Sequence, residues 1–120
     1  MIKVLSAAVT VTDTATSITD LLEATTAGLS DEITADNTGA ISIDIVAAAG
    51  GGDPVVIGNS SIESITAAEV AAGNVPAAGG ALIIAGEQVE LRGNDEGRLD
   101  AENIYLITDS TVNCSLNIWH

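Results

Sequence analysis

Strand-type alternation of apolar and polar residues dominates the chain. The segment AISIDIV at 40–46 places Ile41, Ile43 and Ile45 on one face and its serine and aspartate on the other. Further β-branched or alternating stretches occupy residues 3–12, 54–58, 87–93, 103–108 and 111–119. About seven short strands separated by turns at regular spacing are typical of an all-β fold. We therefore expect a single domain over residues 1–120, a β-sandwich or a jelly-roll-like barrel.

Helical patterns are few and short. Residues 17–24 (SITDLLEA) carry apolar side chains at helical spacing. Residues 66–73 begin with a capping-box pattern, Thr66 with Glu69, and stop at Gly73. The sequence therefore predicts one or two short helical turns.

Two bends punctuate the predicted strands. Gly58-Asn59 follows the apolar run PVVI, and a glycine there permits a turn that a side chain would block. Asp109-Ser110 separates the last two strands and has the composition of a hairpin turn. We expect both bends to shape the edges of the fold.

The last strand has one apolar and one polar face. Alternation directs four side chains to the core, namely Val112, Cys114, Leu116 and Ile118. The opposite face carries Asn113, Ser115, Asn117 and Trp119. A tryptophan on a polar face is costly to leave in water, and tryptophan is enriched among the anchors of protein interfaces. We therefore predict that this face is an interface.

The net charge of the chain limits the kinds of partner that it is expected to bind. There are 17 acidic residues against three basic ones, which gives a formal net charge of −14. Binding to nucleic acid needs clustered cations that neutralise phosphates, and anionic membrane surfaces attract basic segments. We therefore expect no nucleic-acid partner and no membrane partner.

The residues for catalysis are scarce. The single histidine is His120, which we expect to be a frayed end, and the single cysteine is Cys114, which we expect to be a buried hydrophobe. With its only histidine at the last position, the chain offers no ordered base for a Ser-His or Cys-His dyad, and a zinc site needs three or four ligands. A glycosidase groove is normally lined by aromatic rings, and the chain has only Tyr105 and Trp119. We therefore expect a protein that is not an enzyme and has no resident cofactor.

One acidic loop could hold a cation weakly. Asp95, Glu96, Asp100 and Glu102 supply oxygen ligands of the kind that calcium prefers, and nearby glycines let the backbone bend around an ion. The spacing differs from that of an EF-hand, and a solvated loop is the simpler interpretation.

Three segments together resemble a known group of proteins. They are VVIGNSSI at 55–62, AGE at 85–87 and NIYLI at 103–107, followed by a final strand. In this order they are similar to the small β-sandwich proteins of tailed-bacteriophage virions. The resemblance spans nearly the whole chain, although residues 66–81 are longer than the corresponding loop of that group.

The resemblance implies a structural role in the virion. The leading expectation is a capsid decoration (cement) protein that bridges capsomers on the outer surface of the shell, with the major capsid protein or another virion protein as partner. A core built almost without aromatics often needs support from oligomerisation, so we also expect self-association as a homotrimer. The alternatives are a fibre or tail knob that binds a host receptor or glycan, and a secreted adhesion module, which should carry a signal peptide.

Salt is expected to stabilise this chain. Repulsion among the excess carboxylates is screened as the Debye length falls from ~8 Å at physiological ionic strength to ~3 Å at 1 M. The melting temperature, followed by circular dichroism, should therefore rise with sodium chloride. A flat or falling melting temperature would contradict this. Calcium chloride at matched ionic strength is the comparison, since extra stabilisation by calcium would indicate a site at Asp95–Glu102.

Overall fold

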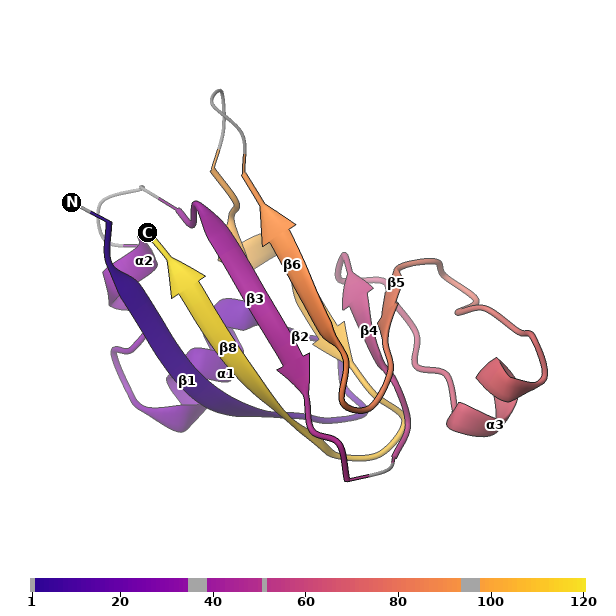
Figure 1. Cartoon of the computed structure of the whole chain (residues 1–120). Coiled ribbons are helices and arrows are strands. Elements are labelled where there is room, and N and C mark those ends of the chain that lie inside the picture. Colours follow the sequence, from indigo (N-terminus) through magenta and orange to yellow (C-terminus); the bar gives the residue numbers. More distant parts are fainter. Residues whose placement is uncertain (1, 35–38, 51, 94–97) are drawn as a thin grey trace.

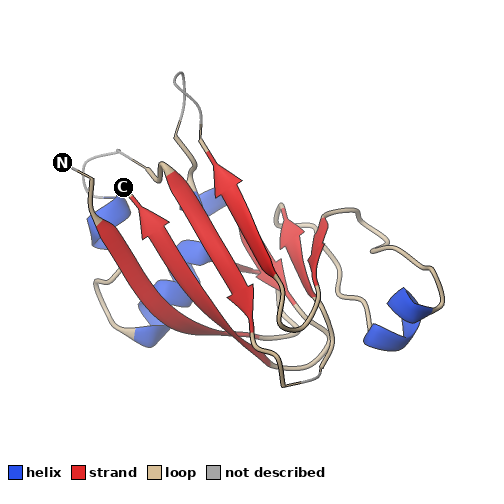
Figure 2. Cartoon of the chain, viewed as in Figure 1, coloured by secondary structure: helices blue, strands red, loops and turns tan. Residues whose placement is uncertain are grey.

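The chain folds into two four-stranded antiparallel sheets with a few short helices (Figures 1 and 2). The computed structural model describes residues 2–34, 39–50, 52–93 and 98–120. Sheet A contains, in order, β1 (Val4–Val11), β8 (Val112–Trp119), β3 (Ser42–Ala47) and β6 (Gln88–Arg92). Sheet B contains β2 (Thr16–Ser17), β7 (Tyr105–Ile107), β4 (Val55–Gly58) and β5 (Ala81–Ile83). The expectation of a mostly β protein is confirmed.

The strands pair as a nested set. The first strand pairs with the last, β2 with β7, β3 with β6, and β4 with β5. Two further ladders, β8 with β3 and β7 with β4, join these pairs into the two sheets. Consecutive strands therefore often lie in different sheets.

The core is aliphatic and is shared by both sheets. Its buried residues include Val9 of β1, Ile43 of β3 and Leu116 of β8 from sheet A, and Val55 and Leu106 from sheet B. The inward face predicted for β8 is confirmed, because all four of its alternating apolar side chains are buried.

In the part of the chain that the structure describes, four short helical segments accompany the sheets, more than the sequence predicts. They are α1 (Ile18–Thr25), α2 (Asp31–Thr34), α3 (Ala67–Ala71) and the 3-10 helix η1 (Ala101–Asn103). The hydroxyl of Ser17 caps α1 by accepting the Asp20 N–H at 3.2 Å, and Leu21 and Leu22 are buried. The predicted helix at 17–24 is therefore confirmed, whereas α2 and η1 lack a strong sequence pattern.

The α3 segment forms an arm beside the sheets (Figure 1). The capping box is present: the Thr66 hydroxyl accepts the Glu69 N–H at 3.1 Å, and the Glu69 carboxylate accepts the Thr66 N–H at 3.2 Å. No residue of α3 is buried. Local capping therefore stabilises this helix, together with the partly buried Val70, which packs against Val56, Ile62, Ile65 and Ile107.

The prediction of a hairpin at Asp109-Ser110 is wrong. These residues connect β7 in sheet B to β8 in sheet A, so the two strands do not pair. Both edges of β8 are occupied by β1 and β3. Thr108, at the end of β7, is buried and donates its N–H to Thr12 and its hydroxyl to Pro54, at 2.9 and 3.1 Å. These two hydrogen bonds hold Thr108 in place at the point where the chain leaves sheet B for sheet A.

The outer face of sheet B is covered by its own chain. Ile62 and Ile65 pack over Val56 and Ile107 in a second buried cluster. Gly58 makes this possible, because a Cβ atom there would overlap Cγ2 of Ile62. Glycine is therefore required at position 58 because two segments of the chain approach each other closely there.

Replacing Gly58 should destabilise the fold. In Gly58→Ala the added methyl must displace Ile62 from the second cluster, and overpacking of this kind costs about 1–3 kcal/mol. The free energy of unfolding in urea measures the effect. Gly50→Ala is the matched control, because a Cβ at Gly50 meets nothing within 4 Å. Equal stability of the two variants would contradict this account of Gly58.

Candidate functional site

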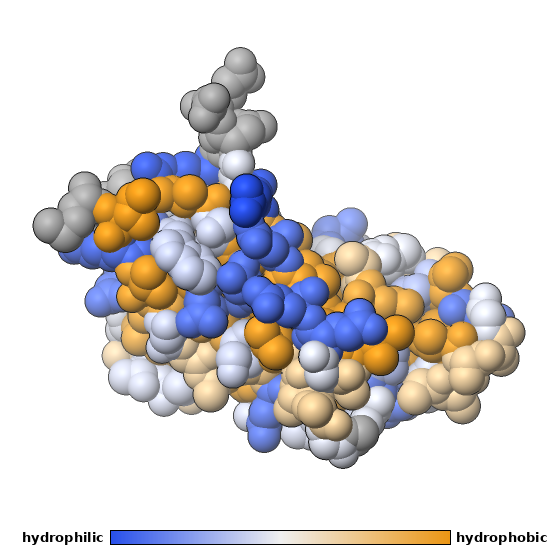
Figure 3. Space-filling view, viewed as in Figure 1, coloured by the Kyte–Doolittle hydropathy of each residue, from blue (hydrophilic) through white to orange (hydrophobic). Residues whose placement is uncertain are grey.

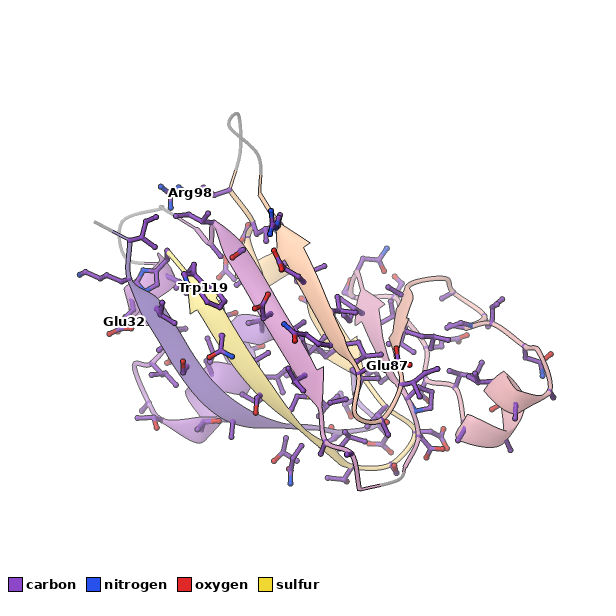
Figure 4. All side chains as sticks on the ribbon, in the orientation of Figure 1. Glu32, Glu87, Arg98 and Trp119 are labelled. Carbon is purple, nitrogen blue, oxygen red and sulfur yellow. The ribbon has the colours of Figure 1, made fainter. Side chains whose placement is uncertain are left out.

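The outer face of sheet A carries large side chains in a regular grid. Cross-strand register aligns one row across the sheet, Val4, Trp119, Ser42 and Arg92, and the next row is Ser6, Asn117, Asp44 and Glu90. Figure 4 shows Trp119 on the face of β8 that is turned away from sheet B. The prediction that Asn113, Ser115, Asn117 and Trp119 share this outward face is confirmed.

A hollow of about 300 Å³ lies over Ser42 in this grid. Trp119 on one neighbouring strand and Arg92 on the other form its walls, and Asp44 and Glu90 lie in the adjoining row. Ser42 has the shortest side chain in its row, so the hollow is open above it.

One end of the hollow is apolar. Ile2 and Ile41 line it, and the side chains of Ile2 and Val4 are 65% and 52% exposed. Figure 3 shows this apolar corner beside the polar surface over β6. The sequence placed Ile41 on the core face with Ile43, and this is wrong: the regular strand begins at Ser42, so the alternation does not extend to Ile41, which lies outside the core.

The Asp44 carboxylate faces a second acid across the strands. Asp44 and Glu90 are directly opposite in the ladder between β3 and β6, where like charges repel. The Oδ1 atom of Asp44 is closed off from solvent and has no hydrogen-bond partner within the described part of the chain. A buried carboxylate oxygen without a partner is energetically costly.

Of these two acids, Arg92 forms an ion pair with Glu90. Its Nε donates to Oε1 of Glu90, and this hydrogen bond, with the charges of Glu90 and then Asp44, raises the pKa of Arg92. The Arg92 side chain is 78% exposed and lies at the rim. The charged side chains of the hollow therefore carry one excess negative charge.

Polar pairs stiffen the rest of the face. The Ser6 hydroxyl donates to Oδ1 of Asn117 at 2.6 Å, and the Thr10 hydroxyl donates to Oδ1 of Asn113 at 3.1 Å. Both pairs join β1 to β8. Asn113 and Asn117 therefore support the surface beside Trp119, and their predicted role in an interface stays a prediction.

His120 is not a frayed end, as the sequence suggested. Its backbone exchanges two hydrogen bonds of 2.9 Å with Lys3, which extends the ladder between β1 and β8. Its side chain is 7% exposed, and Nε2 lies 3.9 Å from Oε2 of Glu32. The imidazole is thus enclosed near α2, apart from the hollow.

The Cys114 thiol is buried in the aliphatic core. Burial raises its pKa to about 11, so the thiol stays protonated at neutral pH. A protonated, enclosed thiol is a poor nucleophile. The interpretation of Cys114 as a buried hydrophobe is confirmed.

The acidic loop proposed for calcium is only partly visible. Asp95 and Glu96 lie outside the described residues. Asp100 caps η1 instead: its carboxylate accepts the Glu102 N–H at 3.1 Å and the Asn103 side-chain amide at 2.7 Å. Across residues 2–34, 39–50, 52–93 and 98–120, no group of three histidine, cysteine or acidic side chains is placed to hold a metal. The calcium site stays a prediction.

Comparison with protein-family models, with curated proteins and with solved structures found no match to this chain. Among the described residues, no helix is long and apolar enough to cross a membrane.

Filling the hollow should change the environment of Trp119. In Ser42→Leu the larger side chain occupies the space between Trp119 and Arg92, so the fluorescence of the chain's single tryptophan should shift to shorter wavelength. The free energy of unfolding should change by less than about 1 kcal/mol, because the position is on an outward face of a strand. Ser115→Leu, on the same face of β8, is the control and should leave the emission unchanged. A shift in both variants, or in neither, would contradict the described hollow.

Proposed function

We propose that the two sheets form a β-sandwich of the jelly-roll type. The nested pairing of first strand with last, through to β4 with β5, supports this, because it is the pattern of a long hairpin rolled into two sheets. The core shared by sheets A and B also supports it. Jelly rolls of eight strands are a common framework of viral capsid domains.

We further propose that the chain is a structural virion protein of a tailed phage, a decoration (cement) protein on the outer surface of the capsid. The observation that carries this proposal is the asymmetry of the two sheet faces. Ile62 and Ile65 cover the outer face of sheet B, whereas the outer face of sheet A presents Trp119 and its hollow. An exposed surface with a partly buried tryptophan is suited to docking on another protein.

The proposed partner is the major capsid protein, which the outer face of sheet A would bridge between neighbouring capsomers. We also propose self-association as a homotrimer. The exposed Ile2 and Val4 at the edge strand β1 support a contact there. Nucleic-acid and membrane partners remain excluded from the proposal on the grounds of the net charge of −14.

A binding role without catalysis is part of the same proposal. His120 and Cys114, which could serve as base and nucleophile, are enclosed away from the hollow. The hollow is lined by an aromatic ring, two carboxylates and a guanidinium, and binding sites typically combine aromatic and polar groups in this way.

The second candidate is a fibre or tail knob that binds a receptor or glycan. It is favoured by Trp119 lying beside the polar side chains of Asp44 and Arg92, since sugars bind by stacking on aromatic rings and by hydrogen bonds to such groups. Both candidates use the same face of sheet A.

Locating the chain on particles tests the proposed function. Antibody-gold labelling of purified phage particles that carry this gene should mark the outer surface of the head. Label at fibre or tail tips would instead support the knob, and particles without any copy of the chain would overturn both.

Loss of Trp119 should weaken attachment of the protein to particles. Trp119→Ala removes the wall of the hollow, and truncating an interface anchor costs about 2 kcal/mol or more. Binding of purified variant to particles stripped of this protein gives the affinity, and circular dichroism checks the fold. Ser60→Ala is the control, because Ser60 is exposed in the turn after β4 and is not part of sheet A. Equal affinities of the two variants would show that the contact lies elsewhere, with residues 66–81 as the next surface to test.

A further inference from the structure

Asp44, which lines the hollow on sheet A, has no cation hydrogen-bonded to it among the described residues. Asp44 and Glu90 face each other across β3 and β6, but the hydrogen bond from Arg92 is to Glu90. Asp44 retains a charge that is not matched by a hydrogen-bonded cation, and one of its oxygens is closed off without a partner in the described residues. A cation in the hollow would relieve the repulsion between the two carboxylates.

The shape and lining of the hollow select the kind of cation. A volume of about 300 Å³ is at the lower limit for small-molecule sites, so it suits a single side chain. The indole of Trp119 offers a ring face to a planar cation, and Ile2 and Ile41 offer apolar contact to an alkyl stem. A guanidinium combines these properties, because it is planar, stacks on aromatic rings and donates charge-assisted hydrogen bonds to carboxylate oxygens.

We propose that the hollow over Ser42 binds an arginine side chain of the partner protein, with its guanidinium at the Asp44 carboxylate and its stem along Trp119. The net charge of −14 favours approach of such a basic group. That this arginine belongs to a capsid partner rests on the proposed function. The binding of an arginine side chain in the hollow does not, and it can be tested without phage particles.

The test uses Nα-acetyl-arginine amide as the probe and the isotope-labelled full chain. The indole N–H of Trp119 is the single tryptophan signal in a nitrogen–proton NMR spectrum, so it reports directly on the hollow. We expect saturable shifts of this signal and of the Ser42 and Asp44 amides at millimolar probe. The neutral isostere, Nα-acetyl-citrulline amide, should bind at least ten times more weakly, because it keeps the shape of the probe without its charge.

Variants separate the site from the general attraction of an acidic protein. Asp44→Asn should weaken binding of the arginine probe at least tenfold, and Ser42→Leu should abolish it by filling the hollow. Glu87→Gln is the control, since it also removes one negative charge but lies at the far end of sheet A (Figure 4). The amide spectrum of each variant verifies that it is folded.

The outcomes are distinct. Equal binding of the arginine and citrulline probes, equal effects of Asp44→Asn and Glu87→Gln, or no saturable shift of the indole signal at probe concentrations up to about 50 mM would each overturn the inference. If the probe fails while Trp119→Ala still weakens attachment to particles, the arginine inference is wrong and the proposed function stands. If the probe binds but the chain is absent from particles, the site stands and the proposed function is wrong.

Discussion

The position of β8 between β1 and β3 is the constraint on which the rest of the molecule depends. Its two ladders run without interruption, pairing Val4 through Val11 on one side and Ser42 through Ala47 on the other. A strand with partners on both sides has no freedom to slip, because a shift of one residue would turn its apolar side chains to water. The same register that buries Leu116 and Ile118 therefore fixes Trp119 on the outer face, next to Ser42.

The hollow follows from that register and from differences in side-chain size. Ser42 lies between Trp119 and Arg92 only because β3 pairs with β8 on one edge and with β6 on the other. These three residues come from distant parts of the chain, and neither Ser42 nor Arg92 stands out in its own segment. Strand pairing thus places the polar lining and Trp119 on strands of one sheet, whereas Ile2 and Ile41 lie just before β1 and β3.

Local patterns predicted the strands well and their partners poorly. Alternation identified both faces of β8 and the buried face of Ile43 and Ile45, and the capping box at Thr66 was readable because its residues are close in sequence. The pairing of strands depends on contacts over more than a hundred residues, such as Ser6 with Asn117, so the hairpin at Asp109-Ser110 was predicted wrongly and the hollow was missed. Trp119 was the one signal in the sequence that pointed to the site.

The arm at residues 66–81 has a practical consequence for engineering. It is stabilised by its own capping box and by a hydrogen bond from the Ala67 N–H to the Asp53 carboxylate, while α3 buries no residue. A Cβ at Gly73 would meet nothing nearby, and Val75 is well exposed, so the segment that follows α3 is a suitable insertion point for a foreign peptide. Such a peptide would project from the side of the molecule rather than from sheet A, leaving the hollow free, so that the chain could serve as a carrier for displayed sequences (Figure 1).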